Sequence, residues 1–192
     1  MNNQTKAKET DNENSDINID DEFLKAHTYF LSGEINEESI SKACRWLIYE
    51  NLKIGKPKIL TLIINSTGGN LTEAFALIDL MRSSTHTIKT IGIGNIMSSA
   101  FMIFAAGTKG ERTIGRNTSI LCHQYSTEME GKHHDLKAAI REGDLVNERM
   151  VNLIVECSDL PVKTIKTKLF PPSDVYLTAE QMVELGIADK IL

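Results

Sequence analysis

The sequence has little cysteine, no long hydrophobic run and no excess of positive charge, and each absence excludes a class of protein. Its three cysteines are odd in number and show no C-x-x-C spacing. They therefore argue against a disulfide framework or zinc site and favour reduced thiols. The longest apolar run, Ala100 to Ala106, has seven residues, whereas a membrane-spanning helix needs about 20. We expect a soluble, cytoplasmic protein that binds no metal and has no membrane partner.

Acidic charge is concentrated at the N-terminus. Residues 1–22 hold seven acidic side chains against two lysines, whereas residues 23–192 hold 19 of each sign, and the formal net charge is −5. The balanced remainder has no electrostatic preference for nucleic acid. Residues 1–22 are polar, nearly free of large apolar side chains and unlike a secretory signal, so we expect a disordered acidic leader. Residues 23–192 are expected to form a single domain.

Two kinds of hydrophobic pattern alternate along the chain. Runs rich in β-branched residues predict strands over 29–31, 59–64, 88–93, 112–114, 119–123 and 188–192. Helical spacing predicts helices after the first three strands, then over 135–157, 162–169 and from a capping box at 178–181. The continuous apolar run at 59–64 is typical of a strand buried on both faces of a mainly parallel sheet. The alternation predicts an α/β layered fold built from right-handed crossovers.

Two of these helices have a predicted buried face. In the first helix, that face consists of Ile40, Ala43, Cys44, Leu47 and Ile48. In the long helix over 135–157, the inner stripe consists of Leu136, Ile140, Gly143, Val146, Met150, Leu153 and Cys157.

The stretch from Gly94 to Gly107, G-N-I-M-S-S-A-F-M-I-F-A-A-G, places two serines at the start of a helix-length apolar run. A buried helix needs hydroxyl groups at its first turn only to cap it or to perform chemistry there. The start of a helix also offers unpaired backbone N–H groups and a positive dipole, which suit a developing oxyanion. Ser98 is therefore the first candidate nucleophile.

A candidate base and a candidate orienting acid follow later in the chain. His123 ends the strand 119–123, where it is either a general base or a structural residue. Its neighbour Cys122 points to the opposite face of the strand, so these two cannot act as a nucleophile–base pair, and Cys122 is expected in the core. Asp174 is either a turn residue or the group that orients the histidine. The other four histidines are expected at the surface.

Two adjacent glycines, Gly68 and Gly69, occupy a predicted turn over 66–70 after a buried strand. Such a pair permits positive φ angles and a close approach of the backbone to a ligand. A phosphate-binding loop is disfavoured because neither a Walker nor a G-x-G-x-x-G spacing is present. The turn supplies either an oxyanion-hole donor or only a tight reversal of the chain.

Four segments together resemble the proteolytic subunit of the Clp protease, the ClpP family. They are I-I-N-S-T-G-G-N-L-T (63–72), I-G-I-G-N-I-M-S-S-A-F-M-I-F-A-A-G-T-K-G-E-R (91–112), N-T-S-I-L-C-H-Q-Y (117–125) and D-V-Y-L-T-A-E-Q-M-V-E-L-G-I-A-D-K-I-L (174–192). The resemblance is collinear from about Thr28 to the C-terminus. It implies a ClpP/crotonase-like β–α spiral with a protruding long helix, the handle.

The resemblance also implies an activity and assigns residues to it. It implies a serine-type endopeptidase with Ser98 as nucleophile, His123 as base and Asp174 as orienting acid. The backbone N–H groups of Gly69 and Ser99 take the positions of the oxyanion hole. Self-association into heptameric rings, stacked in pairs around a chamber for polypeptide substrates, is implied as well. An AAA+ unfoldase is the implied partner and would use the ATP, while this chain itself needs no cofactor.

The chain departs from the family pattern at several positions. Thr67 and Tyr125 stand where proline is usual, Ser99 and Ala100 replace methionine and glycine, Ser173 replaces arginine, and the handle segment has a single glycine. Such divergence would suit a bacteriophage-encoded or plastid-type member. Three alternatives stay open: a catalytically silent ring-forming subunit, a phage capsid-processing protease with the same triad, and an acyl-CoA enzyme of the crotonase type. The crotonase chemistry commonly uses acidic residues, and none lies beside Gly68 and Gly69.

Overall fold

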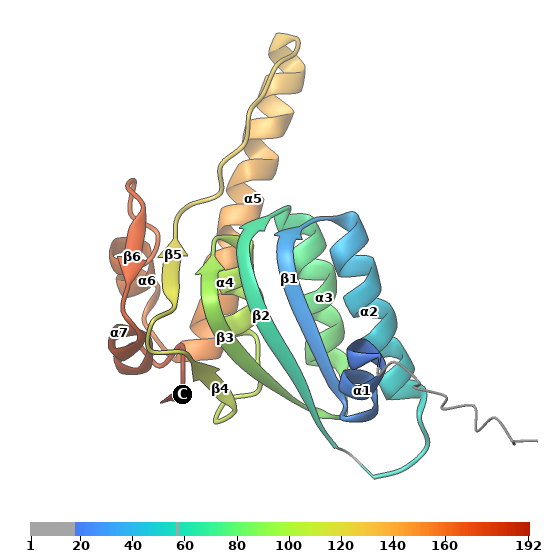
Figure 1. Ribbon diagram of the computed structural model, residues 1–192. Coiled ribbons are helices and arrows are strands. Elements are labelled where there is room, and N and C mark those ends of the chain that lie inside the picture. The colour runs from blue at the N-terminus through green and yellow to red at the C-terminus, as the bar shows by residue number, and fades with distance from the viewer. Residues whose placement is uncertain (1–17, 57) are drawn as a thin grey trace, which may run out of the picture.

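The computed structural model describes residues 18–56 and 58–192, and Figure 1 shows their arrangement. Three βα units come first: β1 (Thr28–Ile35) and α2 (Glu37–Leu52), β2 (Ile59–Gly69) and α3 (Leu71–Ser83), then β3 (Thr87–Met97) and α4 (Ser99–Ala105). They are followed by β4 (Arg112–Ile114), β5 (Ser119–Cys122), α5 (His133–Ser158), α6 (Val162–Lys168), β6 (Val175–Leu177), α7 (Ala179–Glu184) and β7 (Lys190–Ile191). The predicted α/β fold of repeated βα units is confirmed.

The sheet forks at β3. Its main path runs β1-β2-β3-β4-β7 with all neighbours parallel. Along the same edge of β3, β4 pairs with residues 90–92, and β5 pairs with residues 95–97 further along. β6 then adds to β5 in antiparallel orientation. The fork brings the end of β5 next to the start of α4, two places where the sequence predicts chemistry.

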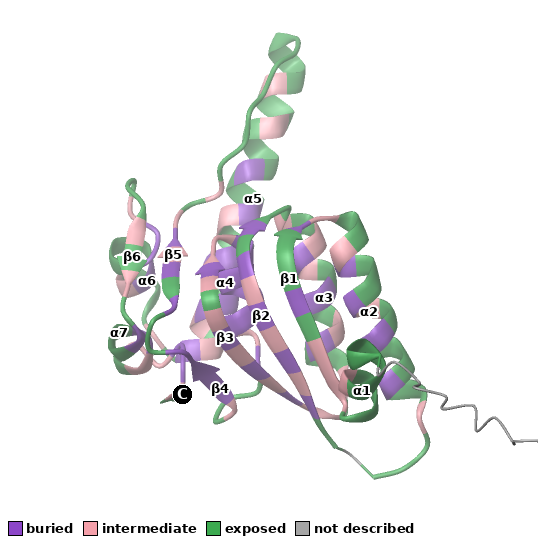
Figure 2. Cartoon of the chain, in the orientation of Figure 1, coloured by how far each residue is buried: buried purple, intermediate pink, exposed green. Residues whose placement is uncertain are grey.

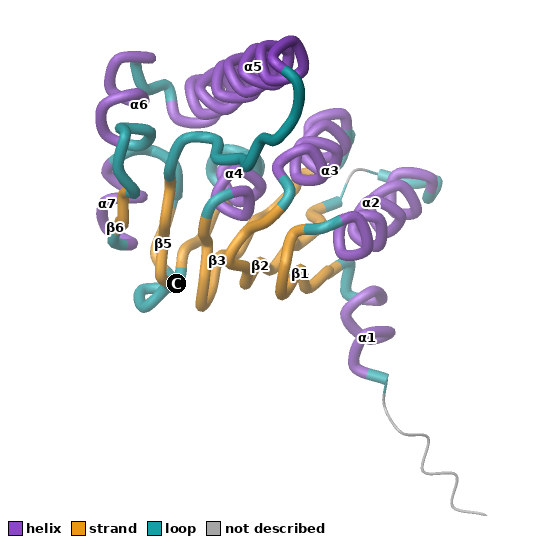
Figure 3. Tube along the Cα trace, turned by 90° about the horizontal axis from the view of Figure 1, so that it is seen from above, coloured by secondary structure: helices purple, strands orange, loops and turns teal. Residues whose placement is uncertain are grey.

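Helices α2, α3, α4 and α5 lie on one side of the sheet, as Figure 3 shows from above. In β2, burial therefore alternates: Leu60, Leu62 and Ile64 are buried, whereas Thr61 and Ile63 are only half-buried. The expectation that this strand is buried on both faces was wrong, because a helical layer covers one face only.

The first predicted helix, α2, begins where expected. Asn36 and Ser39 form a reciprocal capping box, which satisfies two otherwise unpaired N–H groups. The prediction of its inner face was wrong for one residue, because Ile48 is 43% exposed. Trp46 is buried in its place, stacked on Tyr29 of β1. The buried stripe of α2 therefore includes Trp46 and leaves Ile48 outside it.

The long helix α5 extends beyond the body of the molecule, and the chain before it runs back alongside (Figure 1). Its buried residues begin only at Gly143, whereas Ile140 is 58% exposed and Leu136 is half-buried (Figure 2). The predicted inner stripe therefore holds only for the C-terminal part, because the N-terminal turns extend beyond the body formed by the described residues. Of the described helices, none is both long and apolar enough to cross a bilayer.

The expected leader is described in part. Residues 1–17 lie outside the described residues, but residues 19–22 fall in helix α1 (Ile19–Lys25), so the expectation of disorder was wrong there. The Asn18 side chain caps this helix by accepting a hydrogen bond from the Asp20 N–H. The three acidic residues of its first turn, Asp20, Asp21 and Glu22, complement the positive end of the helix dipole.

Candidate active site

Ser98 lies at the sharp junction between β3 and α4. Its backbone has φ 54° and ψ −124°, a conformation that costs a residue with a side chain on the order of 1–3 kcal/mol. Two hydrogen bonds hold it there: its N–H donates to the Leu121 carbonyl (2.9 Å) and its carbonyl accepts from the Phe101 N–H (3.0 Å). All seven residues of α4 are buried, so the helix behind Ser98 is firmly packed. The fold thus maintains a strained serine at a strand–helix turn.

Gly68 makes room for this junction. A Cβ at position 68 would lie 2.7 Å from both the Met97 carbonyl oxygen and the Ser98 Cβ, and φ is +95° there. Glycine is thus required both by the backbone angle and by the close contact. Strand β2 continues to Gly69, so the predicted turn over 66–70 is in fact the end of a strand, with Asn70 capping α3. Gly68 thus allows a close backbone approach to Ser98, whereas Gly69 allows one to Ile35 of β1.

The structure brings His123 to Ser98. His123 follows β5 directly, and its Nε2 lies 2.9 Å from the Ser98 Oγ. Its neighbour Cys122 is fully buried, its thiol points to the Val175 carbonyl, and burial raises the pKa of that thiol to about 12. The prediction that Cys122 belongs to the core is confirmed. The alternation along β5 places the imidazole towards the serine and the thiol away from it.

Asp174 is brought towards Ser98 and His123 by the strand register, but it forms no hydrogen bond with either of them among the described residues. The last registered pair of the β5–β6 ladder is Cys122 with Val175, and one further step along both strands reaches His123 and Asp174. The carboxylate is exposed, and among the described residues no hydrogen bond joins it to the imidazole. The His123 Nδ1 instead lies 2.5 Å from the Gln124 carbonyl oxygen. Because a carbonyl only accepts, Nδ1 carries the proton, and the lone pair of Nε2 faces the Ser98 hydroxyl.

Ser99 and Gly69 line the same pocket as Ser98 and His123. Ser99 is the first residue of α4, so its backbone N–H has no acceptor within the helix. Its side chain is 2% exposed, and its Oγ has no hydrogen-bond partner among the described residues. The hydroxyl that meets the histidine is therefore that of Ser98, and Ser99 presents only backbone at this point.

The pocket has a volume of about 580 Å³ and lies between α3 and α5. Its walls combine polar and apolar side chains, and the apolar part is formed by Leu71, Phe75, Ile78, Val146, Met150 and Leu153. Arg82 of α3 and Glu156 of α5 form an ion pair beside it. An apolar side chain of a bound molecule would fit next to the Ser98 hydroxyl. In the described part of the chain, no group of three or more histidine, cysteine or carboxylate side chains is placed to hold a metal ion.

Three residues for which the sequence predicts no role in the site lie close to His123 or to the segment after it. Gln124 accepts from the imidazole, Tyr125 lines the pocket, and Asn147 of α5 accepts a hydrogen bond from the Tyr125 N–H. Asn147 was detectable in principle: it falls four residues after Gly143, on the buried stripe of α5, where an amide side chain is unusual.

The family model described as Clp protease matches residues 11–192. Because the match covers nearly the whole chain, the chain belongs to the Clp protease family. Membership implies a serine peptidase, and members of this family form oligomeric rings. The finding decides against an acyl-CoA enzyme of the crotonase type.

Proposed function

We propose that this protein is a serine endopeptidase that hydrolyses unfolded polypeptides or short peptides through an acyl-enzyme. The observation that carries the proposal is the 2.9 Å contact between the Ser98 Oγ and the His123 Nε2 at the wall of the pocket between α3 and α5. The strained backbone of Ser98 and the tautomer of His123 support the same assignment.

In the proposed reaction, the Ser98 Oγ attacks the scissile carbonyl while the His123 Nε2 accepts its proton. The backbone N–H groups of Gly69 and Ser99 stabilise the resulting oxyanion. The intermediate then breaks the C–N bond, and His123 returns the proton to the leaving amine. A water molecule, deprotonated by His123, attacks the acyl-Ser98 ester, and cleavage of that ester releases the carboxylic acid and restores the serine.

We assign Asp174 the role of orienting His123 and stabilising the imidazolium. The support is positional, since extending the β5–β6 register by one residue sets the two side by side. In this role the imidazole Nδ1–H turns from the Gln124 carbonyl to the carboxylate as charge develops on the ring.

A fluorophosphonate probe tests the proposal, because it phosphonylates an activated serine. We expect the purified protein to be labelled, Ser98→Ala to abolish labelling and peptidase activity, and Ser99→Ala to retain much of both. Labelling that survives Ser98→Ala and disappears in Ser99→Ala would show that the nucleophile is misassigned. Absence of labelling in an assembled ring would instead favour a catalytically silent subunit.

We further propose that the chain assembles into heptameric rings, stacked in pairs, and receives substrates from an AAA+ unfoldase. The support is membership of a ring-forming family and the protruding part of α5, where the apolar side chain of Ile140 is exposed. Native mass measurement with and without residues 1–22 tests the assembly. A mass that is not a multiple of seven chains would contradict it.

A further inference from the structure

We infer that Asn147 is a positioning residue for His123, acting through the peptide bond between Gln124 and Tyr125. The inference rests on the proposed peptidase function. Asn147 touches neither the serine nor the histidine, and its effect passes through backbone atoms.

The oxygen and the nitrogen of the Asn147 side-chain amide both form hydrogen bonds. Its Oδ1 accepts a hydrogen bond from the Tyr125 N–H at 2.9 Å, and its Nδ2 donates to the Gly143 carbonyl of the preceding helical turn at 3.1 Å. The second bond fixes which end of the amide faces Tyr125. The side chain is half-buried on the packed part of α5, so it is well placed to hold its partner.

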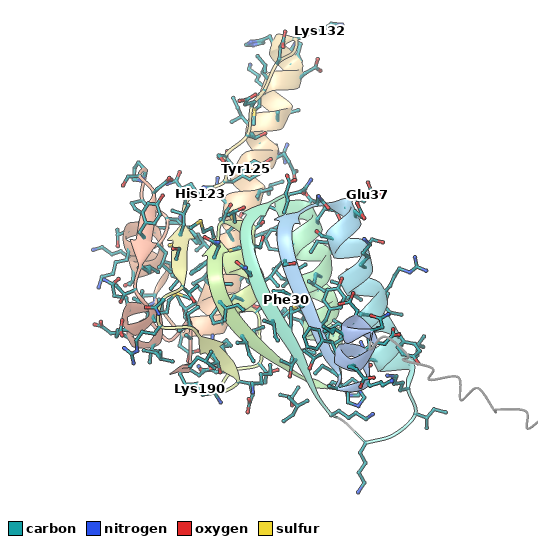
Figure 4. All side chains as sticks on the ribbon, viewed as in Figure 1. Phe30, Glu37, His123, Tyr125, Lys132 and Lys190 are labelled. Carbon is teal, nitrogen blue, oxygen red and sulfur yellow. The ribbon has the colours of Figure 1, made fainter. Side chains whose placement is uncertain are left out.

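Gly143 and the ring of Tyr125 complete the contact. A Cβ at Gly143 would lie 3.7 and 3.8 Å from two carbons of the ring, so the ring packs against the bare surface of the helix. Figure 4 shows Tyr125 beside α5, next to His123. We call the three residues Tyr125, Gly143 and Asn147 the α5 clasp.

The α5 clasp can orient His123 because one peptide group forms a hydrogen bond to Asn147 through its N–H and another to His123 through its carbonyl. The carbonyl of Gln124 accepts from the His123 Nδ1, and the N–H of the same planar peptide group donates to Asn147. Fixing the N–H therefore fixes the direction of the carbonyl, and each bond polarises the other. The chain of contacts runs from Asn147 through the peptide to Nδ1, then from Nε2 to the Ser98 Oγ.

A second anchor holds the other side of this segment. The Gln124 side chain donates from its Nε2 to the Phe170 carbonyl at 2.9 Å, in the loop that leads to Asp174. The segment between His123 and Tyr125 is thus tied to α5 on one side and to that loop on the other. Gln124 itself is exposed, so Asn147 is the better shielded of the two anchors.

The test compares three variants in the full chain. Asn147→Leu removes both hydrogen bonds, whereas Asn147→Asp keeps an acceptor for the Tyr125 N–H. The matched control is Glu148→Leu, at the next, exposed position of α5. Two quantities are measured: the rate constant for labelling of Ser98 by the fluorophosphonate, and hydrogen–deuterium exchange in a peptide containing Tyr125. If Asn147→Leu fails to fold by circular dichroism, Asn147→Ala takes its place.

We expect Asn147→Leu to slow labelling by about ten- to a hundredfold, the scale of a small misplacement of a reacting group, and to speed exchange at Tyr125. Asn147→Asp and Glu148→Leu should stay within a few-fold of the unmodified protein in both measurements. Labelling of Asn147→Leu at the normal rate, or an equal loss in Asn147→Asp, would overturn the inference. If the unmodified protein is not labelled at all, the proposed function fails, and unchanged exchange in Asn147→Leu would still refute the clasp.

Discussion

The two halves of the candidate site are held in different ways. Ser98 rests on α4, in which all seven residues are buried against the sheet and the neighbouring helices. His123 lies at the end of a four-residue strand and is held by hydrogen bonds to a carbonyl and a serine in a partly exposed region. The nucleophile is thus positioned by packing, and the base is positioned by polar contacts.

This difference separates stability from catalysis. A change in the packed half should lower the free energy of unfolding, since core side chains contribute several kcal/mol each. A change in the polar half should slow the reaction while leaving the fold intact, because exposed hydrogen bonds contribute little net stability. Four substitutions, given in order of decreasing effect, test that separation.

Removal of a core side chain of α4, the helix that begins directly after Ser98, should have the largest effect on stability. Phe104 of α4 is fully buried, so Phe104→Ala should lower the free energy of unfolding by about 3–5 kcal/mol. Urea denaturation measures the loss. The control is Phe30→Ala on β1, where the phenyl ring is 41% exposed and the loss should be well below that of Phe104→Ala. Equal losses of stability in Phe104→Ala and Phe30→Ala would contradict the conclusion that Ser98 is positioned by the packing of α4.

Asp174→Asn tests the polar half. If the carboxylate stabilises the imidazolium, labelling of Ser98 should slow by roughly 10²- to 10⁴-fold, the scale of general acid–base contributions. Because Asp174 is exposed, the urea midpoint should hardly move. A loss below about threefold would remove Asp174 from the mechanism and leave the Gln124 carbonyl as the group that orients the imidazole.

A third prediction concerns the anchored end of α5. The buried Arg112 donates to both oxygens of Asp189, to the Gly186 carbonyl and to the Cys157 carbonyl near the end of α5. Partial burial by itself raises the pKa of Asp189, but hydrogen bonds from the side chain and backbone of Arg112, with its charge, outweigh it and lower the pKa below its ordinary value.

The ion pair therefore contributes stability that is fully present above the unfolded-state pKa of aspartate, about 3.9, and is lost as pH falls through the lower folded-state value. We expect the melting temperature to fall more steeply below about pH 4 in the unmodified protein than in Asp189→Asn. Parallel melting curves of the two proteins in that range would contradict the assignment.

The smallest effect is expected at the free end of α5. Ile140 is 58% exposed, so Ile140→Ser should change the stability of the separate chain by no more than about 0.5 kcal/mol. If the protruding helix is a ring contact, the same substitution should weaken assembly by sedimentation. Loss of stability in the separate chain would show that the helix packs back onto its own body.

Much of this arrangement was predictable from local pattern. The strand-then-helix alternation, the capping boxes at Asn36 and Thr178 and the serine at the start of α4 each depend on residues close together in sequence. The distribution of buried faces was less predictable. One strand alone cannot tell whether helices cover one face or both, and an amphipathic helix such as α5 looks the same whether or not its partner belongs to the same chain.

In the candidate site, the sequence could predict the reactive side chains but not the backbone contacts that position them. Ser98 and His123 could be proposed because hydroxyl and imidazole groups are conspicuous in an apolar helix and at a strand end. The contacts of Gln124 and Tyr125 use a backbone carbonyl and a backbone N–H, which every residue except proline possesses, so the side chains at these positions do not reveal them. Such contacts depend on how the peptide planes are turned, and only the folded chain determines that.

The short link between β4 and β5 governs which way the imidazole faces. The Gly115 N–H and the Thr118 hydroxyl both donate to the Gly92 carbonyl, which sets the point at which β5 joins β3. Successive side chains of a strand point to opposite faces, so a slip of one residue would exchange the places of Cys122 and His123. One inserted residue between 115 and 118 would then place the Cys122 thiol next to the serine and turn the imidazole to the opposite face, leaving every residue of the site present in the chain and its chemistry lost.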